Sequence, residues 1–310
     1  MTTTAFRTKS RRSQRPAWDE EPSFAGKFVK AAFLICYAAA IVLPIWAVIA
    51  TSFASESALQ DAGGNLLLLP NDLSTQAYEQ ILGGGALTNS LIVTILLTVG
   101  GTAISMVLTI GAAYGLSRPG SLLHRPLLML VLFTFLFGPG MYPSYLVVQQ
   151  LGLLDSYWSL ILPSALNAFN LIVLRAFFMN SVPGELIDAA KMDGAGELRI
   201  LFRVVLPMSK AILAVIALFY AVGYWNIYFQ AVLYTPGLET QPIQVVLQRM
   251  LMSTQGMPGA DIGQYQAAEA APTAALKMAV VVCTIVPIVI MYPFIQKHFT
   301  KAIITGAIKG

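Results

Sequence analysis

The sequence predicts an all-α integral membrane protein, and two observations carry this prediction. Of its 310 residues, 56% are hydrophobic and only 11% are charged, whereas a typical soluble domain has about 25% charged residues. The chain also contains six segments that are long and apolar enough to cross a bilayer as helices, which takes about 20 residues each. This composition excludes a soluble globular domain.

The six predicted spans divide the chain into a membrane domain and two tails. Residues 1–27 are polar and predict a flexible cytosolic tail, residues 28–297 hold the spans, and residues 298–310 predict a second cytosolic tail. No apolar run precedes Phe28, which argues against a secretory signal peptide. The predicted spans are Phe28–Phe53, Leu87–Leu116, Leu127–Gln149, Trp158–Met179, Met208–Tyr234 and Ala274–Ile295.

The distribution of basic residues among the loops predicts the membrane orientation. The loop from Ala54 to Ala86 and the loop around Asp155 contain no lysine or arginine. Because lysine and arginine accumulate in cytoplasmic loops, we expect these two loops outside, together with the segment between Pro236 and Pro272, and both termini in the cytosol. The loops and the tail expected in the cytosol carry Arg118, Arg125, Lys191, Arg199, Arg203, Lys297, Lys301 and Lys309.

Several groups that would drive transport or catalysis are missing from the predicted spans. None of the spans contains an aspartate or a glutamate, although ion-coupled carriers usually place such groups or unwound polar backbone at membrane depth. The chain also lacks a phosphate-binding glycine loop with its lysine, and Cys36 and Cys283 form no metal-ligand pattern. A secondary carrier and an intramembrane enzyme are therefore both disfavoured, and a transporter of this kind needs an external motor.

Glycine and proline interrupt several of the predicted spans. The densest group is Gly138-Pro139-Gly140 with Pro143 in the third span. A backbone carbonyl freed by such a break must find a partner within the protein or in a water-lined cavity. The group predicts a kink, and both a helix that lines a pathway and a simple packing kink fit it.

A polar segment between the fourth and fifth predicted spans contains the most informative motif. The segment Pro183 to Pro207 reads PGELIDAAKMDGAGELRILFRVVLP. It resembles the EAA loop of ABC importer permeases, whose pattern is E-A-A, three residues, G, nine residues and I-x-L-P. Asp188 replaces the glutamate and Val204 replaces the isoleucine, while Gly194 falls on the glycine.

This resemblance implies a cytosolic helix-turn-helix, the coupling loop, that lies in a cleft of an ATPase subunit. We expect a short helix from Glu185 to Met192 with an acidic first turn, a turn at Gly194, a second helix over Ala195–Val205, and a fifth span that begins at Pro207. Leu201 and Phe202 are expected to add apolar anchoring. The residues expected at the ATPase are Glu185, Asp188, Ala189, Ala190, Asp193, Gly194 and Leu198.

Two further motifs indicate a carbohydrate as the solute. Tyr224-Trp225-Asn226 followed by Tyr228-Phe229 resembles the W-N-x-[FY]-x segment of carbohydrate permeases, and the closing FTKAIITGAIKG resembles that of maltose-type permeases. Motifs between Tyr142 and Pro163 resemble the subgroup linked to oligosaccharides and polysaccharide fragments. Sugars are bound by aromatic faces and by amide and hydroxyl groups. The fifth predicted span offers such groups at Tyr220, Tyr224, Trp225, Asn226, Tyr228 and Gln230. The predicted pathway residues are Tyr224, Trp225, Asn226, Tyr228, Asn167 and Asn170.

Other roles fit some of these residues. Asn167 and Asn170 fit helix packing as well as sugar contact, and Trp225 fits an interfacial belt. Trp225 and Tyr228 share one helical face, while Asn226 points about 100° away in a regular helix. Arg175, near the cytosolic end of the fourth span, fits an interhelical pair or a side chain that extends to the interface.

The resemblance also implies the rest of the machine. It implies a second, different permease subunit, two ATPase subunits that hold ATP and Mg, and an extracytoplasmic solute-binding protein, assembled in a bacterial cell membrane. This chain is then a transport subunit that is not an enzyme, and it needs no cofactor of its own and no nucleic acid. The alternative is an ABC importer permease for a peptide or polyamine, and a cationic solute would favour a pathway lined by carboxylates.

Overall fold

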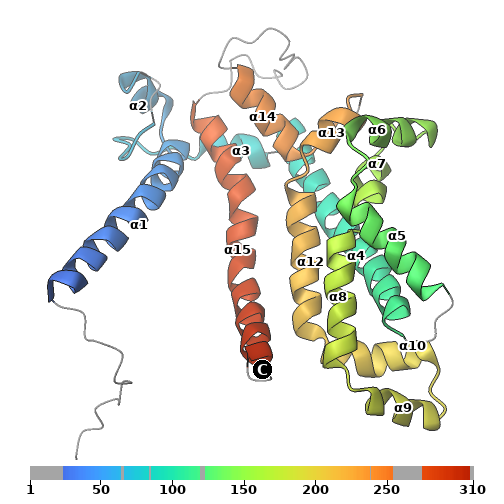
Figure 1. The fold of residues 1–310 in the computed structure, drawn as a ribbon. Coiled ribbons are helices and arrows are strands. Elements are labelled where there is room, and N and C mark those ends of the chain that lie inside the picture. The colour runs from blue at the N-terminus through green and yellow to red at the C-terminus, as the bar shows by residue number, and fades with distance from the viewer. Residues whose placement is uncertain are drawn as a thin grey trace, which may run out of the picture. The chain divides into compact units, whose positions relative to one another are not determined.

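In the computed structural model, the regular elements of the described residues are all helices, joined by turns and loops (Figure 1). These residues are 24–63, 66–83, 85–118, 123–237, 239–253 and 274–307, with only the backbone described over 294–307. Within them the one β-type pairing is an isolated antiparallel bridge between Ala54 and Leu73. Most of the predicted N-terminal tail and the segment 254–273, which we predict to lie outside, fall beyond the described residues.

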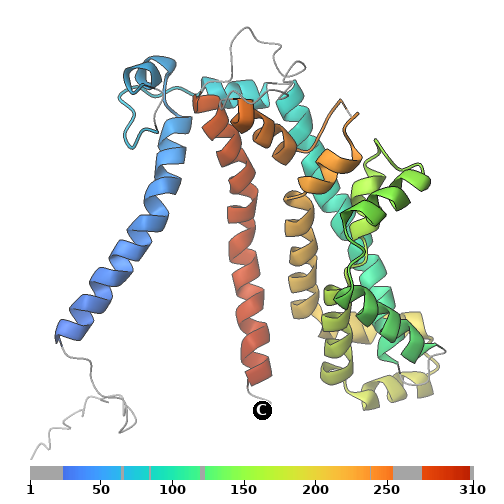
Figure 2. The ribbon, with the colours of Figure 1, turned by 45° about the horizontal axis from the view of Figure 1, so that its top comes forward.

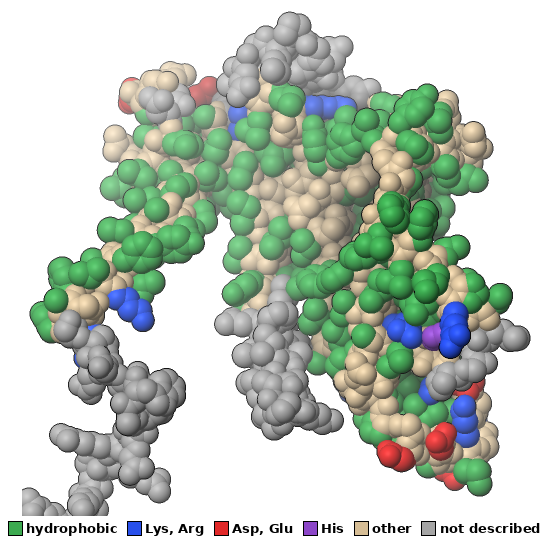
Figure 3. Space-filling model, in the orientation of Figure 1, with side chains coloured by type: hydrophobic (Ala, Val, Ile, Leu, Met, Phe, Trp, Pro, Cys, Tyr) green, Lys and Arg blue, Asp and Glu red, His purple; other side chains and the backbone are tan. Residues whose placement is uncertain are grey.

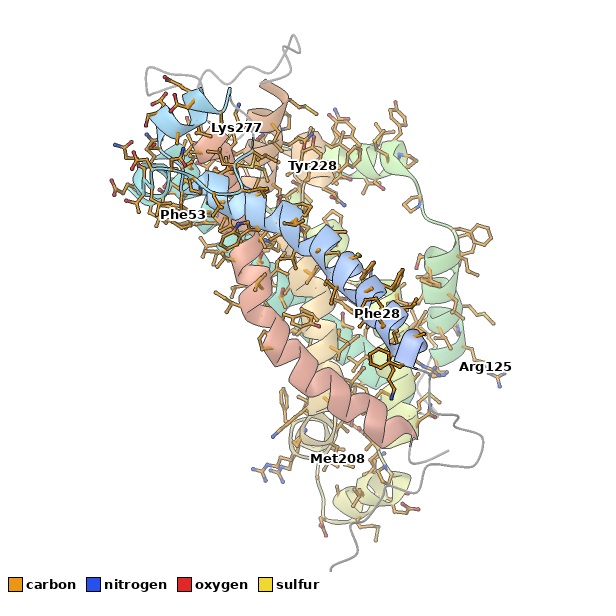
Figure 4. The ribbon with its side chains drawn as sticks, turned by 90° about the vertical axis from the view of Figure 1, so that its left-hand side faces the viewer. Phe28, Phe53, Arg125, Met208, Tyr228 and Lys277 are labelled. Atoms are coloured by element: carbon orange, nitrogen blue, oxygen red, sulfur yellow. The ribbon has the colours of Figure 1, made fainter. Side chains whose placement is uncertain are left out.

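The chain separates into two compact parts, residues 1–47 and residues 48–310. The first part holds most of α1 (Phe24–Ser52), which begins four residues before the predicted Phe28 and continues through Pro44. Figure 4 labels Phe28 and Phe53 near the two ends of this helix. Most of its apolar side chains are exposed, as expected of a helix that meets lipid or another subunit.

The second part is built around α4 (Ala86–Ser117), α8 (Ala168–Ser181), α12 (Lys210–Trp225) and α15 (Ala274–Ala307). α12 packs on the other three of these helices, and α4 also packs on α8, which Figures 1 and 2 show from two sides. The buried face of α4 consists largely of small residues three or four positions apart. They are Ser90, Thr94, Thr98, Gly101, Ser105 and Thr109.

Small residues let two helices approach closely in a membrane, where lipid gives little hydrophobic driving force for packing. Gly101 marks the closest approach, because a Cβ added there would lie 2.8 Å from the ring of Tyr224 on α12. The face of α4 therefore fixes how near α12 can come.

The predicted third span is broken where glycine and proline gather. α5 (His124–Leu136) and α6 (Met141–Gln150) are separated by the segment around Pro139, and Gly140 has a φ of +81°. The predicted fourth span is also broken. α7 (Trp158–Ile161) and the 3₁₀ turn η1 (Leu162–Ser164) meet α8 at a bend of 46°.

The fifth predicted span begins later than expected. α10 (Glu197–Ile200), a π-helical turn η2 (Leu201–Val205) and α11 (Leu206–Met208) run on together, and α12 then departs at 88°. Our expectation that Pro207 begins the span is wrong, since Pro207 lies within α11, before the bend. Ser209 at the bend is fully buried, and Lys210 starts the membrane helix.

The fifth span is also interrupted after Trp225. α13 (Phe229–Tyr234) follows a short break, and Figure 4 labels Tyr228 there and Met208 toward the other end of α12. Among the described residues, three helices are long and apolar enough to cross a membrane, or up to five if each bent pair counts as one span. The all-helical prediction is confirmed over the described residues, whereas six spans stay a prediction.

Three short helices lie at the end of residues 48–310 that is opposite the 88° bend before α12. These are α2 (Glu56–Asp61), α3 (Gln76–Leu82) and α14 (Ile243–Ser253). The loop before α7 is tied to the segment after α13, because the carboxylate of Asp155 accepts a hydrogen bond of 2.6 Å from the N–H of Gly237. Such contacts hold the ends of the broken spans together.

The close approach at Gly101 can be tested by adding one methyl group. We expect Gly101→Ala to destabilise the protein by about 1–3 kcal/mol, the usual cost of overpacking a tight interface, because Tyr224 must move. The measurement is the unfolding free energy of the purified protein in detergent. Gly100→Ala is the matched control, since a Cβ there meets nothing within 4 Å, and equal stability of the two variants would contradict the packing described here.

Candidate coupling loop and substrate cavity

The coupling loop is a helical hairpin that turns at a glycine. α9 (Gly184–Met192) corresponds to the predicted helix from Glu185 to Met192, which confirms that element. Gly194 has a φ of +74°, a left-handed conformation that glycine adopts without the strain of a Cβ. The turn is closed by hydrogen bonds from the N–H of Gly194 to Lys191 O (3.0 Å) and from the N–H of Ala195 to Ala190 O (2.9 Å).

Most of the residues that we expect at the ATPase lie on the surface of this hairpin. Ala190 is half-buried against the core, and Leu198 is 72% exposed. Figure 3 shows acidic side chains gathered at the tip that α9 forms. The exposed members of the predicted set are Glu185, Asp188, Ala189, Asp193, Gly194 and Leu198.

Apolar side chains also extend from the hairpin into solvent. Met192 is 88% exposed and Phe202 is 64% exposed, whereas Leu201 is only 6% exposed and packs in the core with Ile200 and Val205. Our expectation that Leu201 anchors a partner is therefore wrong. Helical spacing placed it beside Leu198, but the π-helical turn directs it inward.

Glu197, which the sequence analysis missed, joins the hairpin to α4. Its carboxylate accepts a hydrogen bond from the hydroxyl of Tyr114 and lies 3.2 Å from the ammonium of Lys191. The guanidinium of Arg118 donates to the Tyr114 oxygen at 2.6 Å and lies 4.4 Å from the centre of that ring. The hydrogen bond from Tyr114, with help from Lys191 and Arg118, lowers the pKa of Glu197 below its ordinary value, so the carboxylate is charged at neutral pH.

Hydrogen bonds also cross from α4 to α12 at two levels. The Tyr220 hydroxyl lies 2.6 Å from Thr109 Oγ1, and the Tyr224 hydroxyl lies 2.9 Å from Ser105 Oγ. Tyr220 also accepts a hydrogen bond of 3.0 Å from the backbone N–H of Asn167, just before α8. These two tyrosines therefore tie three helices together.

Arg175 is held by two other helices. Its Nε donates to the carbonyl oxygen of Leu116 at 2.8 Å, and its terminal nitrogen lies 3.3 Å from Nε2 of His124. Of the two roles that the sequence analysis considered for Arg175, this arrangement matches the interhelical pair. The carbonyl of Leu116 lies in the last turn of α4, where no following N–H of the helix can donate to it. Arg175 supplies the missing hydrogen bond.

A cavity of about 360 Å³ lies where the broken fourth and fifth spans face each other. Its lining combines amides, aromatic rings and hydroxyl groups, and contains no charged side chain. The lining residues are Ser164, Asn167, Asn170, Phe219, Tyr220, Gly223, Tyr224, Asn226, Ile227 and Gln230.

The cavity brings together only part of the predicted pathway set. Asn167, Asn170, Tyr224 and Asn226 line it, although the Tyr224 hydroxyl is already bonded to Ser105. Trp225 does not line it, because its indole N–H donates to the carbonyl oxygen of Thr284 on α15 at 2.9 Å.

Tyr228 also lies off the cavity lining and packs half-buried against a core cluster. Phe219 also lines the cavity, and the sequence analysis did not expect it there. Tyr220 and Gln230, which the sequence analysis named among the sugar-binding groups of the fifth predicted span, line the cavity as well.

Comparison with known proteins gives one family and several close relatives. Residues 23–305 match the family model described as "Binding-protein-dependent transport system inner membrane component". The polygalacturonan/rhamnogalacturonan transport system permease protein YtcP of Bacillus subtilis (strain 168) is 46% identical over 278 residues, covering 90% of this chain and 96% of YtcP. Protein LplC of the same organism is 40% identical, over 90% of this chain and 92% of LplC.

A solved structure agrees with these relatives. A chain from the crystal structure of a bacterial ABC transporter involved in the import of the acidic polysaccharide alginate has a TM-score of 0.79 to this protein. The two are 31% identical, and the match covers 91% of this chain and all of the other. Both the sequence and the fold are therefore those of a permease that works with a binding protein.

Proposed function

Since this chain belongs to the family of binding-protein-dependent inner membrane transport components, we propose that it is one of two permease subunits of an ABC importer for an oligosaccharide. Family membership makes it a membrane transport subunit, not an enzyme. The observation that carries the choice of solute is the cavity between the broken spans. Its amide, hydroxyl and aromatic lining suits a hydroxyl-rich solute, and a cationic solute would find no carboxylate there.

The relatives support a carbohydrate. YtcP and the alginate transporter are both named for polysaccharides. Neither name refers to a peptide or a polyamine, so the alternative solutes have no support among them. We assign the sugar contacts of this subunit to the cavity residues Asn167, Asn170 and Asn226, and not to Trp225 or Tyr228.

The partners follow from the family. A second, different permease completes the pathway, an extracytoplasmic binding protein delivers the sugar, and two ATPase subunits hold ATP and Mg. The exposed tip of α9 and the turn at Gly194 enter a cleft of one ATPase. When ATP closes the ATPase pair, the hairpin moves, and Glu197 carries the motion to Tyr114 and Arg118 on α4.

We further propose six spans with both termini in the cytosol. α5 with α6, α7 with α8, and α12 with α13 then form the third, fourth and fifth spans. Figures 1 and 2 both show the C-terminal end of α15 toward the end that carries α9 and α10, which supports a cytosolic C-terminus. The basic residues of that end agree with this orientation.

Impermeant thiol labelling tests the orientation. In a Cys36→Ser/Cys283→Ser background, Asp61→Cys and Asp155→Cys should react in intact cells, because we place both outside. Arg199→Cys should react only after permeabilisation, because it lies on the hairpin. Labelling of Arg199→Cys in intact cells, or protection of either aspartate position, would reject the proposed topology.

A substitution at the hairpin turn tests the coupling role. Gly194→Leu forces a branched side chain into a left-handed backbone, a strain of roughly 1–2 kcal/mol, and should displace α10 from α9. We expect sugar-stimulated ATP hydrolysis of the reconstituted importer to fall about tenfold, the change that corresponds to about 1.4 kcal/mol, while the protein still inserts into the membrane.

Gly196→Leu is the matched control for this experiment. Gly196 lies two residues away with a φ of −71° and ψ of 162°, which leucine adopts without strain, and no atom lies within 4 Å of an added Cβ. Normal coupled hydrolysis in Gly194→Leu would refute the role of the turn. Equal loss in both variants would mean that a bulky side chain anywhere on this surface blocks the ATPase.

A further inference from the structure

The cavity is bounded on one side by the start of a helix. α8 begins at Ala168, next to the break in the fourth span, and Asn167 and Asn170 from its first turn line the cavity. The Asn167 side chain accepts from the N–H of Asn170 at 3.1 Å. The N–H groups of Ala168 and Phe169 have no acceptor among the residues that the structure describes.

Such a helix start attracts negative charge. The unpaired N–H groups and the aligned peptide dipoles give it a partial positive charge. In membrane transporters, the N-termini of helices interrupted within the membrane point at anionic groups of the substrate. A helix start alone does not make a site, and the side chain of Asn170 supplies the second observation.

The side chain of Asn170 is largely covered, and its amide has no hydrogen-bond partner within the described part of the chain. Asn170 is only 4% exposed and lines the cavity. Its backbone N–H is bonded to Asn167, but its side-chain amide makes no hydrogen bond to any described residue. Because Asn170 lines the cavity, its amide can donate a hydrogen bond to a group that enters the cavity.

The cavity lining has no negatively charged side chain that would repel an anion. No aspartate or glutamate lines it, so an incoming carboxylate meets no like charge. The residue that caps the C-terminal end of α12, Asn226, also lines the cavity. Carbonyl oxygens at a helix C-terminus accept hydrogen bonds, and sugar hydroxyls can supply them.

We infer that this cavity binds the carboxylate of a uronate unit in an acidic oligosaccharide, with the Asn170 amide and the first turn of α8 as donors. The inference rests on the proposed function. It adds that the substrate is negatively charged and names the residues that recognise this charge. It agrees with two relatives, since polygalacturonan consists of uronate units and alginate is named as an acidic polysaccharide.

The test changes the charge at Asn170 while keeping the size of its side chain. Uptake of digalacturonate is measured in vesicles that contain the complete importer and its binding protein. Asn170→Asp places a negative charge beside the bound carboxylate and should lower uptake at least about tenfold, since like charges near contact repel each other. Asn170→Leu, of similar volume and without charge, should lose clearly less.

Two controls separate charge from structure. Asn180→Asp makes the same change at the other, exposed end of α8 and should leave digalacturonate uptake unchanged. The dimethyl ester of digalacturonate has nearly the same shape but no charge, and Asn170→Asp should transport it about as well as the unmodified importer does.

The outcomes distinguish this inference from the proposed function. Equal losses in Asn170→Asp and Asn170→Leu, no loss in Asn170→Asp, or an importer that takes up only uncharged oligosaccharides would each overturn the carboxylate site and leave the sugar permease intact. An importer that takes up no oligosaccharide with any binding protein encoded beside it would overturn both. If the ester is not delivered, the three variants with digalacturonate decide the question.

Discussion

The close packing of α12 against α4 is the constraint on which the rest of this structure depends. Small side chains on α4 let the two helices approach until the Tyr224 ring occupies the space beside Gly101. The hydroxyls of Tyr220 and Tyr224 then reach Thr109 and Ser105 on α4. Buried hydroxyls need partners, so these bonds fix the rotation of α12 as well as its distance, and they set which of its residues face the cavity.

α4 also connects the two candidate sites, the coupling hairpin and the cavity. At its C-terminal end, Tyr114 of α4 holds Glu197 of the coupling hairpin. One turn and a half earlier, Thr109 holds Tyr220, which in turn accepts from the backbone N–H of Asn167 at the cavity. A displacement of the hairpin therefore has a continuous, hydrogen-bonded route to the start of α8. We infer that α4 transmits the closure of the ATPase to the cavity.

Local sequence rules predicted the elements that depend on local chemistry. The helix that begins near Glu185, the turn at Gly194 and the break near Gly138-Pro139-Gly140 all follow from residues within a few positions of each feature. The family motif also led to the correct family over nearly the whole chain.

Features that depend on contacts between distant segments could not be read in this way. Leu201 turns inward because a π-helical turn shifts its direction, and the 88° bend follows Met208 and not the proline. Trp225 faces α15, where its N–H finds a carbonyl 59 residues away. Glu197 escaped notice because its partner Tyr114 is 83 residues distant.

The most direct test of this account is the number of sugar molecules imported per ATP hydrolysed in Tyr220→Phe. This change removes one hydroxyl and leaves Thr109 and the N–H of Asn167 without their shared partner, a loss of about 1–3 kcal/mol. If α4 transmits the motion, the importer should assemble and hydrolyse ATP but import several-fold less sugar per ATP. An unchanged ratio would contradict the claim that this contact joins the coupling hairpin to the cavity.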